Sequence, residues 1–297
     1  MKALLPILCL SLFVSRANAQ LFTLVNKDSE PIEFANVLFY QNDTLVAGTY
    51  STTKGEVYLS SELNFDKVVI SHLSYNDTTI NKEDITDVVA LKRNKAMLDV
   101  VTVTSGDDLP LSYIGEELMR RSNTSMSVEK GLSLRILMLL SPEDKEAKRL
   151  KSFVFHAKRK KKHEPFYVKV VFFENNDEIP GKQIPAEIIA SVVKQKNNRI
   201  VVDIEDESIM LPTTGLFVGI EFIGTEGDLS LKEVDLSDRE SFLELMVNLV
   251  DISNSNATLF QSSLSRESNG WISYDDFFEG FNEGEILVPV FGVEVFD

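Results

Sequence analysis

Short runs of apolar and β-branched residues, separated by polar turns, fill the chain between residues 21 and 104. These runs comprise residues 22–25, 36–40, 45–50, 56–59, 68–73, 88–91 and 100–104. Their residue types favour strands, and turn signals every ~8–12 residues are typical of a β-sandwich. Gly55 follows Thr53 and Lys54 between two runs, where a turn can need a positive φ. Residues 20–104 are therefore predicted to form a first β-sandwich.

From residue 131 to residue 297 the pattern again predicts mainly strands. The expected strands comprise residues 132–140, 150–157, 166–173, 200–204, 215–223, 258–262, 271–274 and 286–296. The run 188–193 fits a strand or a helix. The chain is thus predicted to be mainly β. An immunoglobulin- or transthyretin-like sandwich is followed by a larger β-sandwich, with one or two short helices.

Three places favour helix. Residues 109–119 are weakly helical and lie within a polar stretch, so residues 105–130 are predicted to be a linker with a short helix. Apolar side chains recur at i, i+3, i+4 and i+7 over residues 239–250, which predicts a helix there. Ser141-Pro142-Glu143 suits the first residues of a helical turn.

The first nineteen residues differ from the rest. Lys2 precedes an apolar run, Leu4 to Val14, and Ala17-Asn18-Ala19 has the A-x-A pattern of a cleavage site. The run is too short to span ~30 Å of hydrocarbon. Residues 1–19 are therefore expected to be a signal peptide, and the mature chain is expected to begin at Gln20 without a transmembrane segment.

Residues 21–104 carry a series of short motifs, which comprise Val25, Pro31-Ile32, Ala35-Asn36-Val37, Gly48-Thr49, Gly55, Ser71, Tyr75 and 98–104. In this order the motifs resemble those of the carboxypeptidase-regulatory-like family that is common in Bacteroidota. Thr23, Thr52 and Ser74 depart from the family pattern, where Gly, Asp and Gly are usual. The resemblance implies a non-catalytic β-sandwich in an exported protein of the cell envelope, in the periplasm, on the outer-membrane surface or outside the cell.

The second domain carries motifs of its own at residues 166–173, Pro180, Ile184-Pro185, 202–204, 209–212, 215–222 and 268–271. These motifs resemble the C-terminal half of small Bacteroidota proteins with the same architecture. This resemblance supports the architecture only and implies no particular activity. About 190 residues follow the first domain, too few for the plug and barrel of an outer-membrane receptor, so that function is not carried over.

Charge and cysteine content narrow the classes of partner. The net charge is −16, and loss of Lys2 and Arg16 with the signal would make it −18, which disfavours nucleic-acid binding. Cys9 is the one cysteine and lies in the predicted signal. A mature chain without cysteine forms no disulfide and no zinc–thiolate site.

Catalytic motifs are scarce. The sequence has no H-E-x-x-H, no G-x-S-x-G and no G-x-x-x-x-G-K-[ST] pattern. His72 lies on an apolar run, where packing in a core or an interface is expected. Acidic side chains cluster at residues 203–207 and 275–279, and these could supply a glycosidase pair or a calcium site. No catalytic, cofactor or metal site is predicted from these patterns.

Two surface features are candidate ligand contacts. The basic run 158–162 is unusual in so acidic a chain, and Lys160, Lys161 and Lys162 could contact anionic lipopolysaccharide or an acidic glycan. A solvated hairpin tip is the alternative. Trp271 and Tyr274 could stack on a sugar ring, although alternating aromatics more often belong to a core.

We interpret the sequence as a non-enzymatic binding or interaction module of the cell envelope. Its partner is expected to be an unidentified envelope protein or a glycan. One alternative is a glycan-binding protein or glycan hydrolase. Another is an accessory partner of an outer-membrane complex that acts by strand addition near residues 100–104.

Overall fold

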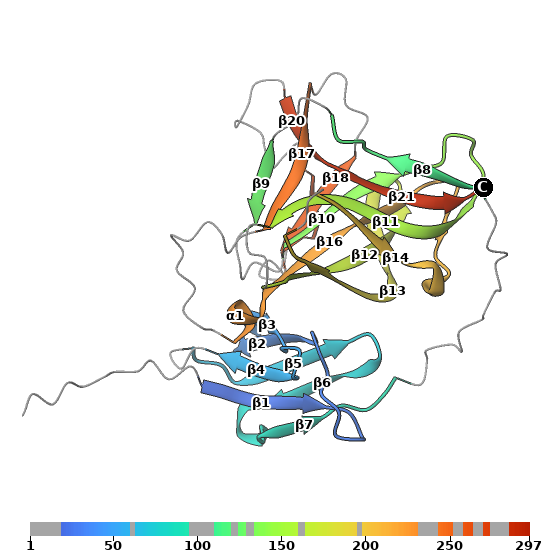
Figure 1. Ribbon diagram of the computed structural model, residues 1–297. Coiled ribbons are helices and arrows are strands. Elements are labelled where there is room, and N and C mark those ends of the chain that lie inside the picture. Colours follow the sequence, from blue (N-terminus) through green and yellow to red (C-terminus); the bar gives the residue numbers. More distant parts are fainter. Residues whose placement is uncertain are drawn as a thin grey trace, which may run out of the picture.

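The computed structural model is built almost entirely of strands (Figure 1). Among the residues it describes, the helical elements are α1 (Glu226–Leu229) and the 3-10 turns η1 (Lys82–Asp84) and η2 (Glu205–Glu207). The predicted mainly β class is therefore confirmed. The described residues are 19–59, 63–94, 110–119, 124–128, 134–159, 164–194, 198–230, 243–251, 258–263, 270–273 and 285–297.

Residues 19–94 form an N-terminal unit, drawn in blue to teal at the bottom of Figure 1. A three-stranded sheet has the order β4-β1-β7 and a four-stranded sheet the order β3-β2-β5-β6. Side chains of both sheets, such as Leu24, Phe39 and Val89, share one core. The strands are β1 (Ala19–Val25), β2 (Asn36–Gln41), β3 (Thr44–Tyr50), β4 (Glu56–Leu59), β5 (Lys67–His72), β6 (Tyr75–Asn81) and β7 (Val88–Ala90).

Residues 111–297 form a larger C-terminal unit, whose first sheet has six strands in the order β13-β12-β16-β10-β18-β19. All neighbours in this sheet are antiparallel. We call it the six-stranded sheet. Its strands are β10 (Leu134–Leu140), β12 (Phe166–Asn176), β13 (Ile179–Val192), β16 (Leu216–Thr225), β18 (Leu259–Ser263) and β19 (Ile272–Ser273).

The second sheet of the C-terminal unit has the order β20-β17-β11-β21-β8. Strands β14 and β15 also pair with β11, and β9 pairs with β17. The strands are β8 (Leu111–Gly115), β9 (Ser125–Val128), β11 (Lys148–Arg159), β14 (Arg199–Asp203), β15 (Met210–Leu211), β17 (Leu243–Asp251), β20 (Glu285–Pro289) and β21 (Phe291–Phe296). Phe153, Phe155 and Phe291 of this sheet share a core with Phe166 and Phe172 of the six-stranded sheet.

Side chains alternate between the two faces of the six-stranded sheet, because successive residues of a strand point to opposite sides. Even-numbered residues of β10, β12, β13 and β16 enter the core of the C-terminal unit. Odd-numbered residues face the other way, and we call this side the outer face. At one end the outer face carries a buried apolar patch of Leu137, Val171, Phe173 and Phe217.

The other end of the outer face lies against the N-terminal unit (Figure 1). We call this end the junction face. It combines apolar side chains, which pack against the N-terminal unit, with charged ones. Its residues are Arg135 of β10, Tyr167 and Lys169 of β12, Glu187 and Ile189 of β13, and Glu221 and Ile223 of β16.

The helix predicted over residues 239–250 is wrong, because residues 243–251 form strand β17. The helical spacing of Leu245, Met246 and Leu249 coincides with an alternating set, Leu243, Leu245 and Val247, which is fully buried. Pairing with β11 on one side and β20 on the other selects the strand. Hydrogen bonds to distant segments thus override the local pattern.

The predicted linker also needs correction. Residues 111–115 are strand β8 rather than a short helix, and β8 pairs with β21. Residues 125–128 are strand β9, paired with β17. Both strands belong to a sheet of the C-terminal unit, so this unit begins near residue 111 rather than residue 131. Residues 141–144 form a turn without a helix.

Local predictions hold better in the N-terminal unit. Gly55 has a φ of 73°, as the turn between β3 and β4 requires. An added Cβ at Gly55 would lie 2.4 Å from the carbonyl oxygen of Leu24. Strand β6 was missed because most of its residues are polar, as its position at the edge of the sheet allows. Residues 100–104, predicted as a strand, and residues 1–18 lie outside the described residues.

Candidate functional site

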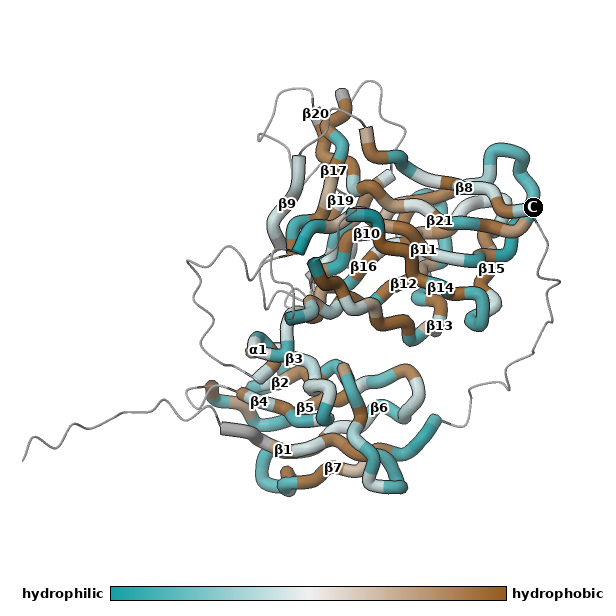
Figure 2. Tube along the Cα trace, in the orientation of Figure 1, coloured by the Kyte–Doolittle hydropathy of each residue, from teal (hydrophilic) through white to brown (hydrophobic). Residues whose placement is uncertain are grey.

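A small apolar cluster joins the two units. The Phe34 ring of the N-terminal unit lies 4.8 Å from the Tyr167 ring, measured between centroids. Tyr50, Ile223 and Leu229 complete the buried part of the cluster. Figure 2 shows the apolar colouring concentrated in the sheets, with α1 beside β3 where the units meet. The cluster excludes water from the middle of the junction.

Glu221 places a buried carboxylate in this junction. Its side chain is 4% exposed, and it lies in the middle of β16, where every residue is buried. Arg135 donates to one carboxylate oxygen and the Tyr50 hydroxyl donates to the other. Burying a charge is costly unless it is paired and hydrogen-bonded. Glu221 therefore couples the β10–β16 pair to the end of β3 in the N-terminal unit.

A second polar contact crosses the junction at the β5–β6 hairpin. His72 and Tyr75 pair across this hairpin, with Leu73 and Ser74 as its turn. The His72 Nε2 lies 2.6 Å from a Glu187 carboxylate oxygen, and the Ser74 hydroxyl donates to the other oxygen at 3.3 Å. Packing of His72 in an interface, one of the expected roles, is what the structure shows.

Burial and hydrogen bonding act in opposite directions on Glu187. Burial alone would raise the pKa of its carboxyl. The hydrogen bond from His72, the positive charges nearby and the hydrogen bond from Ser74 outweigh burial and hold the pKa below its ordinary value of 4.5. Glu187 is therefore an ionised hydrogen-bond acceptor at neutral pH.

Ser74, His72 and Glu187 are residue types of a nucleophilic triad, but they are arranged differently. The Ser74 hydroxyl bonds to the carboxylate instead of to a histidine nitrogen. The His72 Nδ1 accepts a hydrogen bond from the Ser74 backbone N–H at 3.2 Å, and its Nε2 faces Glu187. Neither ring nitrogen can take a proton from the Ser74 hydroxyl in this geometry.

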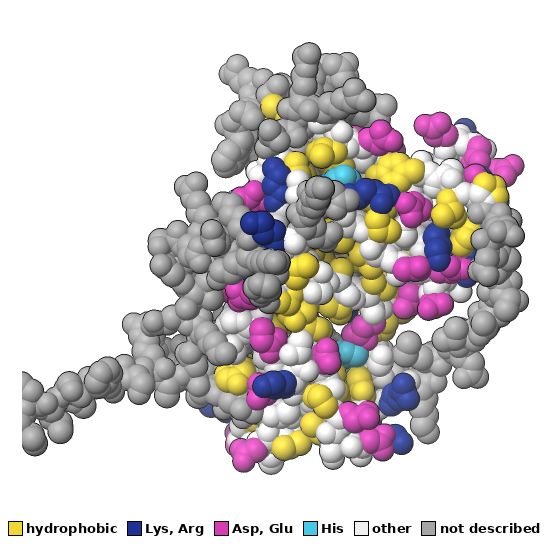
Figure 3. Space-filling view, viewed as in Figure 1, with side chains coloured by type: hydrophobic (Ala, Val, Ile, Leu, Met, Phe, Trp, Pro, Cys, Tyr) yellow, Lys and Arg dark blue, Asp and Glu magenta, His cyan; other side chains and the backbone are white. Residues whose placement is uncertain are grey.

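A groove runs along the junction on both sides of His72 and Tyr75. One hollow of about 330 Å³ is lined by Asn36, Tyr50, Asn94, Arg135, Lys169 and Gln183, among others. A second hollow of about 330 Å³ is lined by residues that include Arg93 and Glu187. Figure 3 shows a histidine and acidic side chains where the two units meet. Each hollow is as large as the smaller ligand pockets of proteins, ~300 Å³.

Two polar groups in the groove have unused hydrogen-bonding capacity. The Asn36 Oδ1 is buried without a hydrogen-bond partner. The Lys169 ammonium makes no hydrogen bond or close ion pair among the residues that the structure describes, and its charge acts on Glu187 across the groove. Buried polar groups without partners are uncommon in native proteins. The Lys169 ammonium therefore leaves one donor available to a ligand, whereas the Asn36 oxygen is an unsatisfied acceptor that is shielded from solvent.

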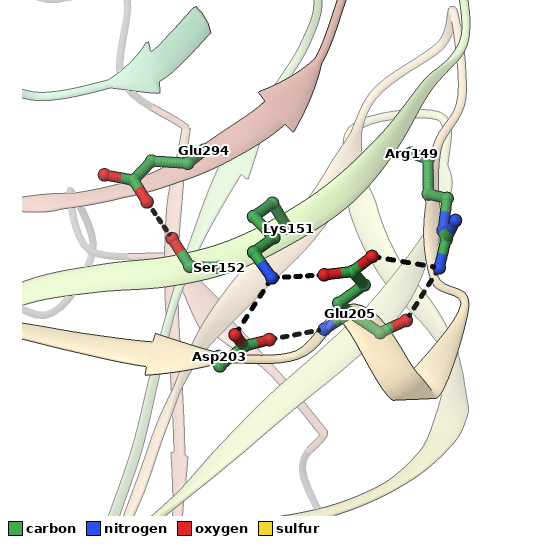
Figure 4. Close-up of polar contacts among 6 residues, drawn as sticks. All are labelled: Arg149, Lys151, Ser152, Asp203, Glu205 and Glu294. Atoms are coloured by element: carbon green, nitrogen blue, oxygen red, sulfur yellow. Dashed lines mark hydrogen bonds and ion pairs between the residues drawn. The ribbon is translucent and has the colours of Figure 1, made fainter. Parts of the chain in front are cut away.

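Two acids of the cluster at residues 203–207, Asp203 and Glu205, are paired with cations of β11 (Figure 4). Lys151 binds both Asp203, at 3.0 Å, and Glu205. A backbone hydrogen bond and Lys151 hold the pKa of Asp203 below its ordinary value. Arg149 lies 3.8 Å from Glu205. These contacts fasten η2 to β11, so the cluster serves as an ion-pair network between strands.

Two other carboxylates near this cluster have pKa values that are shifted in opposite directions. Glu294 accepts from Ser152 at 2.5 Å and from Arg199 at 2.7 Å, contacts that hold its pKa below its ordinary value against the effect of burial. Burial, with a smaller contribution from Asp206 and Glu187, raises the pKa of Glu207.

In the described part of the chain, no group of three or more His, Cys, Asp and Glu side chains could hold a metal ion.

Of the predicted ligand contacts, Trp271 is described by the structure and does not line the junction groove. Trp271 is partly buried, and its ring meets Phe173 edge-on at 4.9 Å beside the apolar patch. Tyr274 and the run Lys160, Lys161 and Lys162 lie outside the described residues. Arg159, the preceding residue, has a fully buried side chain that lies 3.8 Å from Glu164 and over the Phe166 ring.

The junction residues were missed at the sequence level, although one signal was present. Glu221 interrupts an otherwise apolar run, 215–223, and a charge in such a run needs a buried partner. Nothing local indicates that Arg135 and Tyr50 are its partners, because they are 86 and 171 residues away. The groove arises from long-range packing of the two units.

Comparison with known proteins gives weak likenesses. No family model and no curated protein matches the chain. A solved structure of the cysteine protease and lectin-like domains of Cwp84, a surface layer associated protein of Clostridium difficile, aligns with a TM-score of 0.39 and 11% identity. The alignment covers 89% of this chain and 59% of that chain.

A structure of the same clostridial cysteine protease after propeptide cleavage aligns with a TM-score of 0.38 and 13% identity, over 89% of this chain and 66% of that one. The chain thus spans less than two thirds of the length of either protein. Within the described residues, no helix combines the length and apolar character needed to cross a membrane.

Proposed function

We propose that the protein is a non-catalytic binding module of the cell envelope that holds a glycan in the junction groove. The observation that carries the proposal is the polar lining of one hollow, which brings Lys169 together with the side-chain amides of Asn94 and Gln183. A sugar hydroxyl both donates and accepts, so one ring could bind the ammonium and an amide at once. Tyr50 and Tyr75 line the same hollow.

The remaining lining residues suit a hydroxyl-rich ligand better than an apolar one. The side-chain amides of Asn94 and Gln183 each offer a donor and an acceptor. Glu221 and Arg135 compensate each other, so the groove presents no strong net charge from that pair. Lys169 adds a cation that could bind the carboxylate of an acidic sugar.

Binding rather than turnover is proposed because Glu221 and Glu187, two of the carboxylates that line the groove, are committed to other contacts. Glu221 is held by Arg135 and Tyr50, and Glu187 by His72 and Ser74. A general acid in a glycosidase needs a raised pKa, whereas the pKa of Glu187 lies below its ordinary value. These commitments favour the non-enzymatic interpretation over the glycan hydrolase alternative.

The test is a screen of the full chain against an array of bacterial and host glycans, followed by titration calorimetry with any glycan retained. Lys169→Met and Gln183→Ala should each weaken binding by about tenfold, the effect of losing one hydrogen bond in a desolvated site. Lys27→Met, in an exposed turn, is the matched control and should bind like the parent. Retention of no glycan, or equal affinity of all variants, would refute the proposal.

Export is a separate part of the proposal and rests on residues 1–19. N-terminal sequencing of the protein from a bacterial envelope fraction should begin at Gln20. An N-terminus at Met1 in that fraction would contradict cleavage. The carboxypeptidase-regulatory-like character of the N-terminal unit likewise remains a proposal, supported by its two small sheets and by the motif order.

A further inference from the structure

Strand β8 forms one edge of the second sheet of the C-terminal unit. It pairs with β21 in antiparallel register, with Tyr113 opposite Glu294. The Glu116 N–H donates to the Phe291 carbonyl at 2.8 Å, and the Asp297 N–H donates to the Pro110 carbonyl at 3.1 Å. In an antiparallel ladder the bonded pairs recur every second residue. Even-numbered residues of β8 therefore bond to β21.

The backbone groups of the odd-numbered residues point away from β21. Leu111, Tyr113 and Gly115 direct their N–H and C=O groups toward the open edge, where no other described strand pairs with them. Strand β8 itself contains no charged residue or proline, the usual devices that protect an edge from further pairing. The edge therefore offers a template for one more strand.

A cavity of about 650 Å³ lies beside this edge. Residues 112–116 line it from one side and residues 138–144, at the end of β10 in the opposite sheet, line it from the other. Ile114 points into the core of the C-terminal unit, where Met138 and Leu140 are buried. The two sheets thus leave space at this edge for side chains of an added strand.

The surroundings of the cavity are acidic. Its lining includes Glu116, Glu143, Asp144 and Asp297 against one cation, Lys148. Lys148 is itself engaged by Asp144 at 2.8 Å, a contact that holds the pKa of Asp144 below its ordinary value. Figure 3 shows acidic side chains gathered at the corner of the molecule that lies near the C-terminus.

We propose that the β8 edge docks an extended basic peptide segment of a partner protein by strand addition. The backbone of the peptide would bond to Leu111, Tyr113 and Gly115. Its alternate apolar side chains would enter the cavity, and its flanking cations would meet Glu116 and Glu143. A second copy of this chain fits less well, since two acidic edges would face each other.

The probe is a fluorescein-labelled peptide of alternating Lys and Val, seven residues long, titrated against the full chain by fluorescence anisotropy. Leu111→Pro removes an outward N–H while leaving the bonds to β21, and it should weaken binding about tenfold relative to Leu111→Ala, which keeps that N–H. Glu143→Gln with Glu116→Gln should weaken binding and reduce its salt dependence. Glu30→Gln with Glu83→Gln, in the N-terminal unit, is the matched control.

A second measurement covers failure of Leu111→Pro to fold. A probe methylated at every backbone nitrogen cannot donate backbone hydrogen bonds, so it should not bind the unmodified protein. Binding of that probe, equal affinity of Leu111→Pro and Leu111→Ala, or no binding of the Lys-Val peptide would each overturn the proposal. A dimer in sedimentation velocity that Leu111→Pro dissociates would overturn it in favour of self-pairing.

Discussion

The outer face of the six-stranded sheet contrasts two ends built on the same strands. At one end Leu137, Val171 and Phe217 form a dry apolar patch. At the other end the odd-numbered positions of the same strands carry Arg135, Lys169 and Glu221 beside the N-terminal unit. Neighbouring positions on one pleated surface thus serve as core or as a polar junction, depending on what covers them.

The difference teaches that burial and polarity are separate properties of this sheet. Phe217 and Glu221 are four residues apart on β16, and both are almost completely buried. Phe217 is stabilised by removal of apolar surface from water, whereas Glu221 depends on partners in two units. The stability of the apolar end should therefore not depend on which side chains are charged. The stability of the junction end should depend on the charges of Glu221 and its partners.

The largest expected effect comes from the apolar end. Phe217→Ala leaves a cavity where a fully buried ring meets Phe260, and it should lower the free energy of unfolding by about 3–5 kcal/mol. Urea denaturation followed by circular dichroism measures it. Phe260→Ala, at a partly exposed ring, is the control and should cost less. Equal losses would erase the distinction between a buried and a peripheral position of the patch.

The next effect comes from the junction end. Glu221→Leu removes the acceptor of both Arg135 and Tyr50 and should lower stability by about 2–3 kcal/mol. Combining it with Arg135→Met and Tyr50→Phe removes the orphaned donors and should restore most of the loss. The readouts are urea denaturation and the rate of limited proteolysis. If the triple variant is as unstable as Glu221→Leu, charge pairing does not account for the stability of the junction.

Gly219 lies between the two ends of the outer face. Its change to alanine should lower the free energy of unfolding by about 1–3 kcal/mol. An added Cβ would lie 1.9 Å from the carbonyl oxygen of Ile136, so β10 and β16 would have to separate. Thermal unfolding measures the loss. Gly270→Ala is a useful comparison, since nothing lies within 4 Å of its Cβ position, although its φ of 65° adds strain of its own. A stable Gly219→Ala variant would mean that the two strands tolerate a wider spacing.

The smallest expected effect is the pH dependence that Glu187 contributes at the junction. Because the folded-state pKa of Glu187 lies below its ordinary value, its contribution is complete above about 4.5 and is lost as the pH falls through the folded value. Glu187→Gln should therefore be less stable than the parent at pH 7, and the difference should shrink on acidification. Thermal unfolding from pH 3 to pH 7 measures it. A constant difference across that range would assign the effect to lost packing.

Much of the fold could be predicted from local pattern, and the failures have a common cause. Strands such as β2 and β16 were predicted because β-branched and aromatic residues dominate them. Strands β8 and β17 were taken for helix because their hydrogen-bond partners, β21 and β11, are remote in the sequence. Local periodicity carries no information about such partners.

The candidate site could be predicted less well than the fold. Trp271 was chosen for its residue type, but its ring packs beside Phe173 at the apolar end. Asn36 belongs to the motif that carried the family resemblance, although its unpaired oxygen could be recognised only in the folded junction. The groove forms where one face of the six-stranded sheet packs against the N-terminal unit. The sequence of a single segment does not predict that packing.

The position of β11 has a consequence for biosynthesis. This strand bonds to β14, β15, β17 and β21, and β21 comprises residues 291–296 at the far end of the chain. The N-terminal unit can close its sheets as soon as residue 94 has been made. The sheet around β11 must wait for almost the whole polypeptide, because its contacts are of high sequence separation. The two units therefore differ in how early their contacts can form, and the first can fold beside a second unit that is still incomplete.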